Sequence, residues 1–296
     1  MPAFKVEDRQ NGQIIMDIRD TLFSSLHDRM FTAQVAATDY GVLAGMRHAL
    51  MYLEELDCEL VSHLDDGTLL QPGEVVLTFR GSAKHVAIAE DRILGVMMAP
   101  SGFATRARQL QLLAGQDLRV VCGGWKKLPQ TMKPTLHAAL AAAGVGMRMV
   151  DGPFVYIDKN YVRMFGGVGK ALDAAKRFFP DHKAVIQLRG DLQPLAIEAR
   201  AAVYGKADVL MVDTGQLDDL DVVLDIVAEC KARDRLKIAF AGGVKEEMML
   251  LLRTRAVDLV DVGGAVLNAP LLDMRVDVMV DQGTHTNTRK AENHGV

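Results

Sequence analysis

The chain has 296 residues, of which 49% are hydrophobic and 24% are charged, and its formal net charge is −4. This length and composition suit one large or two smaller globular domains, and an acidic balance without basic or aromatic repeats argues against nucleic acid as a partner. Charged residues interrupt every long apolar stretch before it could span a bilayer, so no membrane association is expected.

The first hundred residues predict an α+β module. Short turns at Asp65-Asp66-Gly67 and Gln71-Pro72-Gly73 separate its elements. In chain order we expect a strand, a helix, two strands and a second helix, at Thr32–Ala37, Gly41–Leu56, Cys58–Leu64, Glu74–Gly81 and Ala83–Met98. We take Pro100 as the end of the last helix, and we place the N-terminal domain at residues 1–104.

The last of these helices has a strongly apolar face. It carries Arg92 among Ile88, Ile93, Leu94 and Met97. An exposed apolar surface of this kind favours association with another chain. We therefore predict a homodimer or a higher homo-oligomer.

Six apolar, β-branched runs alternate with helix-like stretches in the rest of the chain. The runs are Leu118–Cys122, Phe154–Ile157, Ala184–Leu188, Val209–Val212, Lys237–Phe240 and Leu259–Val262. Strands separated by helices in this way form parallel βαβ units. Glycine-rich or charged turns follow several runs, which favours an α/β barrel over a doubly wound sheet. We place the barrel at residues 105–270, a return segment to the N-terminal domain at 271–282, and a loose tail at 283–296.

One segment of this acidic chain is basic. Residues 119–177 contain ten Lys or Arg against three Asp, a net charge of +7. Lys126 and Lys159 lie at the ends of predicted strands, where ligands bind in α/β barrels, so we expect an anionic small-molecule substrate. The alternative is that these cations lie on solvated helix faces, and we assign Lys170, Lys176 and Arg177 to such faces.

Two glycine pairs follow the last two predicted strands. Gly242-Gly243 and Gly263-Gly264 lie where barrel loops commonly bind phosphate through backbone N–H groups. The alternative is that the glycines only close tight turns. Asp213, at the end of another strand, is a candidate ligand for Mg²⁺ or for ribose hydroxyls, or else an N-cap of the following helix.

The three cysteines, Cys58, Cys122 and Cys230, show no metal-ligand or redox spacing. We expect reduced thiols, with Cys122 buried rather than nucleophilic. The polar first residues lack the apolar core of a secretory signal, and a cytoplasmic location is therefore predicted.

Several fragments, in order and spacing, resemble the quinolinate phosphoribosyltransferase family, also called nicotinate-nucleotide pyrophosphorylase. Gly41–Gly45 resembles its G(V/I)LAG stretch. Glu90–Arg92 and Ser101–Thr105 resemble the ER and LSGIAT motifs of one family helix, in the same order. Lys126 with Pro129 resembles its TRKTxPG loop. Ala143–Arg148 resembles the family's GGGxxHR turn, and Ile157–Asn160 resembles its IKDNH. Three further fragments match in the same way: Ala207–Asp213 to ADIIMLDN, Ala241–Val244 to SGGI and Val262–Ala265 to SVGAL.

The resemblance implies an α/β-sandwich N-terminal domain joined to an incomplete parallel α/β barrel, with an active site completed across a dimer. It implies Mg²⁺-dependent transfer of phosphoribosyl from phosphoribosyl pyrophosphate to quinolinate with loss of carbon dioxide. It makes Lys126, Lys159 and Asp213 candidate catalytic residues, with Asp213 also the metal ligand. Substrate contacts fall to Arg148 and to Arg92 of the partner subunit, and phosphate contacts to Gly242, Gly243, Gly263 and Gly264.

The chain departs from the family's pattern in the expected base pocket. Gly123-Gly124-Trp125 replaces Asp-Thr-Arg, which removes a guanidinium that would hold a carboxylate. Met147 replaces a His, Asp158-Lys159 reverses a Lys-Asp order, and Gln187 or Arg189 stands at an acidic position of the third strand. Trp125 instead offers an aromatic face, which makes it a candidate substrate-binding residue for a larger or less charged ring.

Two other functions remain open. A catalytically weak family member could bind a phosphorylated ligand in a regulatory or biosynthetic role. An unrelated phosphate-handling barrel, such as an aldolase or isomerase, is disfavoured because no strand-centre Schiff-base Lys or paired acid and base is evident. We further expect Lys126, Arg148 and Lys159 to converge on one barrel mouth.

Overall fold

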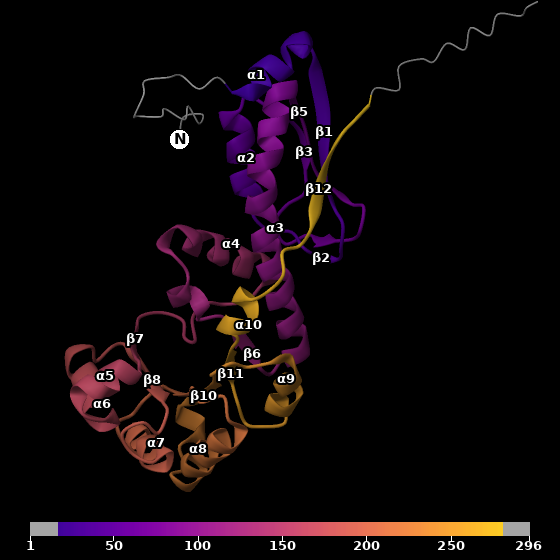
Figure 1. Cartoon of the computed structure of the whole chain (residues 1–296). Coiled ribbons are helices and arrows are strands. Elements are labelled where there is room, and N and C mark those ends of the chain that lie inside the picture. Colours follow the sequence, from indigo (N-terminus) through magenta and orange to yellow (C-terminus); the bar gives the residue numbers. More distant parts are fainter. Residues whose placement is uncertain (1–16, 281–296) are drawn as a thin grey trace, which may run out of the picture.

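The computed structural model describes residues 17–280, and the tail predicted at 283–296 lies outside them. The described chain forms two parts joined by one long helix (Figure 1). The N-terminal part contains α1 (Ile18–Leu22), β1 (Met30–Ala37), β2 (Gly41–Val42), α2 (Met46–Glu55), β3 (Glu59–His63), β4 (Leu69–Leu70), β5 (Val75–Ser82) and the start of α3 (Ala83–Ala114). This is the α+β domain that the sequence predicts.

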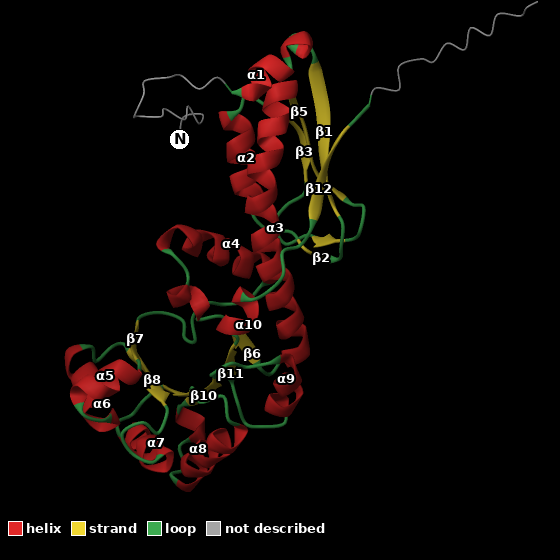
Figure 2. Cartoon of the chain, in the orientation of Figure 1, coloured by secondary structure: helices red, strands yellow, loops and turns green. Residues whose placement is uncertain are grey.

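An antiparallel sheet in the order β12-β1-β5-β3 forms the N-terminal part, with α2 and α3 packed against it (Figure 2). Ile93 and Met97 of α3 are fully buried in the core between these helices and the sheet, and Ile88 and Leu94 pack against the same core. The expectation that this face is exposed is therefore wrong, because the chain's own sheet and α2 cover it. Burial within the chain removes the argument for a dimer that rested on that face.

Helix α3 continues well beyond its expected end at Pro100 and crosses the junction placed at residue 104. Pro100 removes only the N–H that would bond the Val96 carbonyl. Two hydroxyl side chains of α3 bind the segment that precedes α2. The Ala44 N–H donates to Ser101 Oγ (2.9 Å), and the Val42 N–H donates to Thr105 Oγ1 (2.9 Å). Gly41–Val42 is a strand rather than the start of the predicted helix because it pairs antiparallel with β4, with Val42 opposite Leu69.

The second part is a six-stranded, wholly parallel sheet in the order β6-β11-β10-β9-β8-β7. Its strands are β6 (Arg119–Val121), β7 (Phe154–Ile157), β8 (Lys183–Leu188), β9 (Val209–Val212), β10 (Lys237–Phe240) and β11 (Leu259–Asp261). All six predicted strands are present. The sheet curves but does not close, since β6 and β7 are its two edges, so the incomplete α/β barrel is confirmed (Figure 2).

The helices on the outer face of this sheet are α5 (Lys159–Phe165), α6 (Val168–Phe178), α7 (Leu195–Tyr204), α8 (Leu217–Glu229) and α9 (Glu246–Arg253), together with the second half of α3. Helix α4 (Lys133–Ala143) and the short α10 (Gly263–Leu267) pack against α3 (Figure 2). The apolar stripes of the helices and the mostly apolar strands form one large core. On the inner side of the sheet, a smaller cluster around Met149, Val185 and Met211 lies next to the open edge.

After the barrel the chain returns to the first sheet. Strand β12 (Met274–Val278) pairs antiparallel with β1, with Val35 opposite Val276. Before it, the Leu272 N–H donates to the Met98 carbonyl oxygen (3.0 Å). The contact of β12 with β1 ties the two ends of the described chain into the N-terminal sheet.

The thiols agree with the sequence-based expectation. Cys58 and Cys122 are buried, Cys230 is half-buried, and all three are free. Burial raises the pKa of the Cys122 thiol to about 11, so this group is not poised as a nucleophile. Across residues 17–280, no helix is both long and apolar enough to cross a membrane.

Candidate functional site

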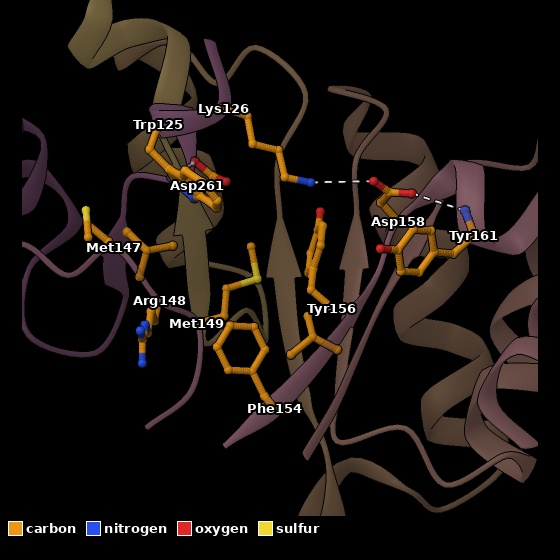
Figure 3. Close-up of a pocket in the computed structure, with 13 residues that line it drawn as sticks. Trp125, Lys126, Met147, Arg148, Met149, Phe154, Tyr156, Asp158, Tyr161 and Asp261 are labelled. Atoms are coloured by element: carbon orange, nitrogen blue, oxygen red, sulfur yellow. Dashed lines mark hydrogen bonds and ion pairs between the residues drawn. The ribbon is translucent and has the colours of Figure 1, made fainter. Parts of the chain in front are cut away.

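A cavity of about 300 Å³ opens at the carboxyl ends of the barrel strands, beside the gap between β6 and β7 (Figure 3). Its lining comes from the ends of β6 and β11, the segment 147–149, strand β7 and the start of α5, with one residue from β8. The lining residues are Val121, Gly123, Trp125, Lys126, Met147, Arg148, Met149, Phe154, Tyr156, Asp158, Tyr161, Val185 and Asp261. Ligands of α/β barrels bind at this end of the strands, and this cavity is therefore the candidate functional site.

The wall of the cavity is aromatic and apolar. Phe154 and Tyr156 lie side by side on β7, with Met149 next to them (Figure 3). Trp125 lines the same space with 41% of its surface exposed, and Lys133 Nζ lies 4.8 Å from the centroid of its ring. Flat aromatic faces of this kind favour an aromatic ring as the occupant.

Lys126 projects into the cavity from the short helical turn after β6. Its Nζ lies 3.5 Å from Asp158 Oδ2 and 4.9 Å from the centroid of the Tyr156 ring (Figure 3). The carboxylate and the ring face both stabilise the ammonium. Part of the positive charge expected at this mouth is thus balanced within the protein.

Asp158 faces the cavity, whereas Lys159 is not among the lining residues. Asp158 is the N-cap of α5, and its Oδ1 accepts from the N–H groups of Asn160 (2.9 Å) and Tyr161 (3.1 Å). Burial opposes ionisation of this carboxyl, but the two N–H donors and Lys126 outweigh it and lower its pKa. Of the three cations expected to converge, Lys126 and Arg148 both line the cavity, but the Arg148 guanidinium points away from Lys126 (Figure 3). Lys159 contributes only its backbone N–H, which donates to Gln187 Oε1 (2.6 Å).

Asp261, at the end of β11, is a lining residue that the sequence analysis missed. Its Oδ1 accepts from the N–H groups of Gly123 (2.9 Å) and Gly263 (3.0 Å). Burial raises the pKa of this carboxyl, which is also close to Asp213. A side chain at position 123 would collide with it, since a Cβ there would lie 2.4 Å from Asp261 Oδ2. The signal was an acid at a strand end before a glycine pair, the same type of pattern that drew attention to Asp213.

Asp213 lies directly after β9. It contacts one side chain within β8, Gln187, and one directly after β8, Arg189. Arg189 Nη1 lies 3.1 Å from Asp213 Oδ2, and Gln187 Nε2 donates to the same oxygen. A guanidinium therefore occupies the place beside this carboxylate that a bound cation would need. The described residues contain no group of three or more His, Cys, Asp or Glu that could hold a metal ion. These residues do not suit a protein-held Mg²⁺ site.

Comparisons with known proteins place the chain in a family. The family model for the N-terminal domain of quinolinate phosphoribosyl transferase matches residues 17–101, and the model for its C-terminal domain matches residues 103–277. The chain belongs to the quinolinate phosphoribosyltransferase family.

Its relatives are distant in sequence. It is 24% identical over 249 residues to a probable nicotinate-nucleotide pyrophosphorylase (carboxylating) of Methanothermobacter thermautotrophicus, covering 83% of this chain and 88% of the relative. It is 23% identical over 280 residues to a protein of the same name from Bacillus subtilis, covering 93% and 91%. The fold is similar to the nicotinate-nucleotide pyrophosphorylase structure from Francisella tularensis, with a TM-score of 0.75, 20% identity and coverage of 90% and 91%.

Family membership gives the sequence fragments a structural meaning. The Gly41–Gly45 and Ser101–Thr105 fragments, far apart in sequence, are hydrogen-bonded to each other where α3 leaves the N-terminal domain. Gly45 (φ 95°) lies so close to α3 that a Cβ would be 2.1 Å from the Val96 carbonyl oxygen. These fragments therefore set the junction between the two parts rather than contribute to the cavity.

The two glycine pairs lie at the barrel mouth but do not line the cavity. Gly242 and Gly243 have left-handed φ values of 101° and 86°, and a Cβ on Gly242 would lie 2.4 Å from the Gly215 nitrogen. Gly263 and Gly264 begin α10, and the Gly263 N–H already donates to Asp261. Close packing thus explains part of the glycine pattern, and their phosphate contacts stay a prediction.

Arg92 lies in the first half of α3, which packs on the N-terminal sheet, and it does not line this chain's cavity. Its Nη1 is 3.5 Å from Glu55 Oε2, and its guanidinium carbon is 5.8 Å from the centroid of the Tyr52 ring. The side chain keeps these partners on its own chain. Its predicted role in a neighbouring subunit's pocket therefore requires a second copy placed against α3.

Proposed function

We propose that this protein is a phosphoribosyltransferase of the quinolinate type, which transfers phosphoribosyl from phosphoribosyl pyrophosphate to a pyridine-carboxylate-like or altered ring acceptor. The observation that carries the proposal is the aromatic cavity at the carboxyl ends of the barrel strands. The family models match both the N-terminal domain and the barrel domain that contains this cavity. Curated relatives across most of the chain carry the name nicotinate-nucleotide pyrophosphorylase.

The chemistry asks the protein chiefly for positioning and for positive charge. The acceptor nitrogen attacks C1′ of the ribose while the bond from C1′ to pyrophosphate breaks and its electrons leave with pyrophosphate. Lys126 and Arg148 at the cavity stabilise anionic groups of the two substrates, and the walls of Trp125 and Tyr156 orient the ring. A role for Mg²⁺ remains a prediction, and no step here depends on it, because Arg189 already satisfies Asp213.

The cavity supports an acceptor that differs from a pyridine dicarboxylate. Trp125 stands where the family has Arg, and Lys126 is shared with Asp158. The arrangement therefore provides one cation, Arg148, that makes no ion pair within the described residues. A guanidinium and an aromatic plane are not interchangeable in a carboxylate site.

We also propose a homodimer or a higher homo-oligomer in the cytoplasm. The support is that Arg92 lies away from its own chain's cavity, so that it can contribute to catalysis only in another copy. Light scattering at micromolar concentration measures the oligomeric state directly. A monomer would overturn this part of the proposal.

The decisive experiment measures pyrophosphate release from phosphoribosyl pyrophosphate with a panel of pyridine carboxylates and other nitrogen heterocycles. Acceptor-dependent release, with a mononucleotide identified by mass spectrometry, is the expected result. Lys126→Ala should reduce the rate by about a hundredfold, since removing one positioned charge typically costs two orders of magnitude. Absence of release with every acceptor would overturn the proposed transfer.

One observation favours a second candidate, a catalytically weak homologue that binds a phosphorylated ligand. The acidic position of the third barrel strand is occupied by Gln187 or Arg189, and Arg189 pairs with Asp213. Such a protein would bind phosphoribosyl pyrophosphate or a sugar 5′-phosphate without turnover. Calorimetry with these ligands separates the candidates, because binding without product formation supports the second one.

A further inference from the structure

The carboxyl group of Asp261 faces the cavity at a position that the family resemblance did not single out. Its Oδ1 is taken up by the N–H groups of Gly123 and Gly263, while Oδ2 accepts no hydrogen bond within the described residues. Asp261 lines the cavity together with the Trp125 side chain (Figure 3). A ring that enters the cavity therefore meets an acceptor oxygen as well as an aromatic wall.

The charges of the lining residues are balanced, although two further cations lie close by: Lys133 beside the Trp125 ring and Lys127, which acts electrostatically on Asp261. Lys126 and Arg148 stand against Asp158 and Asp261 among the lining residues. Lys126 is 3.5 Å from Asp158, which leaves Arg148 as a cation and Asp261 as an acid without an ion pair in the described part of the chain. A ring with two carboxylates would bring one of them toward a buried acid, at a cost that grows as water is excluded.

We propose that the acceptor is a nitrogen heterocycle that presents an N–H group to Asp261 Oδ2, carries at most one carboxylate, and attacks C1′ through a second ring nitrogen. This inference rests on the proposed phosphoribosyl transfer and specifies its acceptor. Asp261 is then a specificity-determining residue. The hydrogen bond from a ring N–H to a carboxylate is charge-assisted and stronger than one between neutral groups.

The same arrangement accounts for the proton. When the second nitrogen forms its bond to C1′ and pyrophosphate leaves with the electrons of the broken C1′–O bond, the ring becomes cationic and its N–H becomes acidic. Asp261 accepts that proton and later releases it to water. Burial raises the pKa of the Asp261 carboxyl, which makes it a better base than an exposed Asp. A pyridine acceptor has no ring N–H to lose, so with such an acceptor Asp261 would not serve as a proton acceptor.

The competing explanation is that Asp261 only joins the loops that follow β6 and β11. Its two bonds to Gly123 and Gly263 fit that purpose. Asp261→Asn separates the two explanations, because the amide oxygen keeps both backbone bonds while an NH₂ group replaces Oδ2. The variant should therefore fold, lose its preference for an N–H ring, and gain one for a ring with a carboxylate.

The probes are two isomers, 2-methylbenzimidazole, which has a ring N–H, and 1-methylbenzimidazole, which has none. Both fit a cavity of about 300 Å³ and contain the same number of atoms. Calorimetry at a pH where both rings are uncharged gives their affinities for the full-length protein without phosphoribosyl pyrophosphate. The wild-type protein should prefer the N–H isomer by about tenfold or more, which is the scale of one hydrogen bond to a charged group.

The preference should fall to about unity in Asp261→Asn, as expected from loss of that single bond. The matched control is Asp158→Asn, which removes another carboxylate at the same cavity and should keep the preference. Equal binding of the two isomers by wild type, no binding of either, or a preference retained in Asp261→Asn would overturn the inference. Failure of the proposed transfer is distinguishable, because it shows as absent pyrophosphate release while the binding ratio is still measured.

Discussion

Arg189 holds Asp213 through two contacts, with Nη1 2.8 Å from the Asp213 backbone oxygen and 3.1 Å from Oδ2. Gln187 joins the pair, donating to the same Oδ2 and accepting from the Lys159 N–H. The end of β8 thus supplies an amide and a guanidinium where the family resemblance led us to expect an acid. Gln187 and Arg189 thus link the ends of β8 and β9 at Asp213, the residue expected to bind a metal ion.

The first prediction concerns this pair. Wild-type protein should show no saturable heat on titration with Mg²⁺ alone, because the Asp213 carboxylate is already neutralised. Arg189→Ala removes the competing charge, and Mg²⁺ binding should then appear by calorimetry; it should be weak, since a single carboxylate holds this ion poorly.

Arg200→Ala is the matched control. Arg200 pairs with Glu229 (2.6 Å) and shares no ion-pair partner with Arg189 or Asp213 among the described residues. It should leave the titration flat. Saturable Mg²⁺ binding by the wild type would show that Asp213 accommodates both cations, and would support the metal role expected from the family.

The second prediction concerns quinolinate. The wild-type protein should form nicotinate mononucleotide from quinolinate and phosphoribosyl pyrophosphate more slowly than about one per second, a modest rate for an enzyme. Trp125 cannot clamp a carboxylate as the family's Arg would, and Asp261 would lie close to a second carboxylate. A family enzyme with Arg at that position serves as the assay control, and turnover by this protein at the control's rate would contradict the prediction.

Restoring the family residue alone should not restore quinolinate use. Trp125→Arg adds a guanidinium, but Met147 and Gln187 also differ from the family pattern, and the nearby Asp261 would attract the new charge. Positioned sites lose activity through small displacements. Quinolinate turnover by Trp125→Arg should therefore stay within about tenfold of wild type.

The sequence predicted the barrel more fully than the site. The apolar runs of β7, β9 and β10 match the structure residue for residue. For β9 and β10 the reason is burial on both faces, which gives a signal that needs no distant partner. Strand β7 is a half-buried edge strand, and its aromatic and β-branched residues carry the signal instead. The extent of α3 could not be read locally, since Ser101 and Thr105 are helical while bonded to a segment some sixty residues earlier. Whether Asp158 or Lys159 faces the cavity likewise depends on the helix N-cap, a one-residue distinction that strand patterns do not define.

The third prediction uses the N-cap of α5. Asp158→Ala should lower the free energy of unfolding by about 1 kcal/mol, because the N–H groups of Asn160 and Tyr161 lose their acceptor, whereas Asp158→Asn keeps the cap and should cost less. Urea denaturation measures both. Equal stability of Asp158→Ala and wild type would show that water replaces the cap without loss.

The last prediction contrasts two carboxyls of the same cavity through pH. Asp158 has a lowered pKa in the folded protein, so its contribution to stability is present above the ordinary Asp value of about 3.9 and is lost as pH falls through the lower folded value.

Asp261 has a raised pKa, so the folded state binds its proton more tightly than the unfolded state does. The free energy of unfolding therefore falls as pH rises from the ordinary Asp value toward the higher folded value. Asp261→Asn, which keeps the bonds to Gly123 and Gly263, should then melt at a higher temperature than wild type at neutral pH, while Asp158→Asn melts lower. Both differences should shrink on acidification toward about pH 3, where the ordinary Asp is protonated. Thermal melts of the three proteins from about pH 3 to pH 8, the range across which these groups titrate, test this, and a lower melting temperature for Asp261→Asn at neutral pH would show that the ionised carboxylate stabilises the fold.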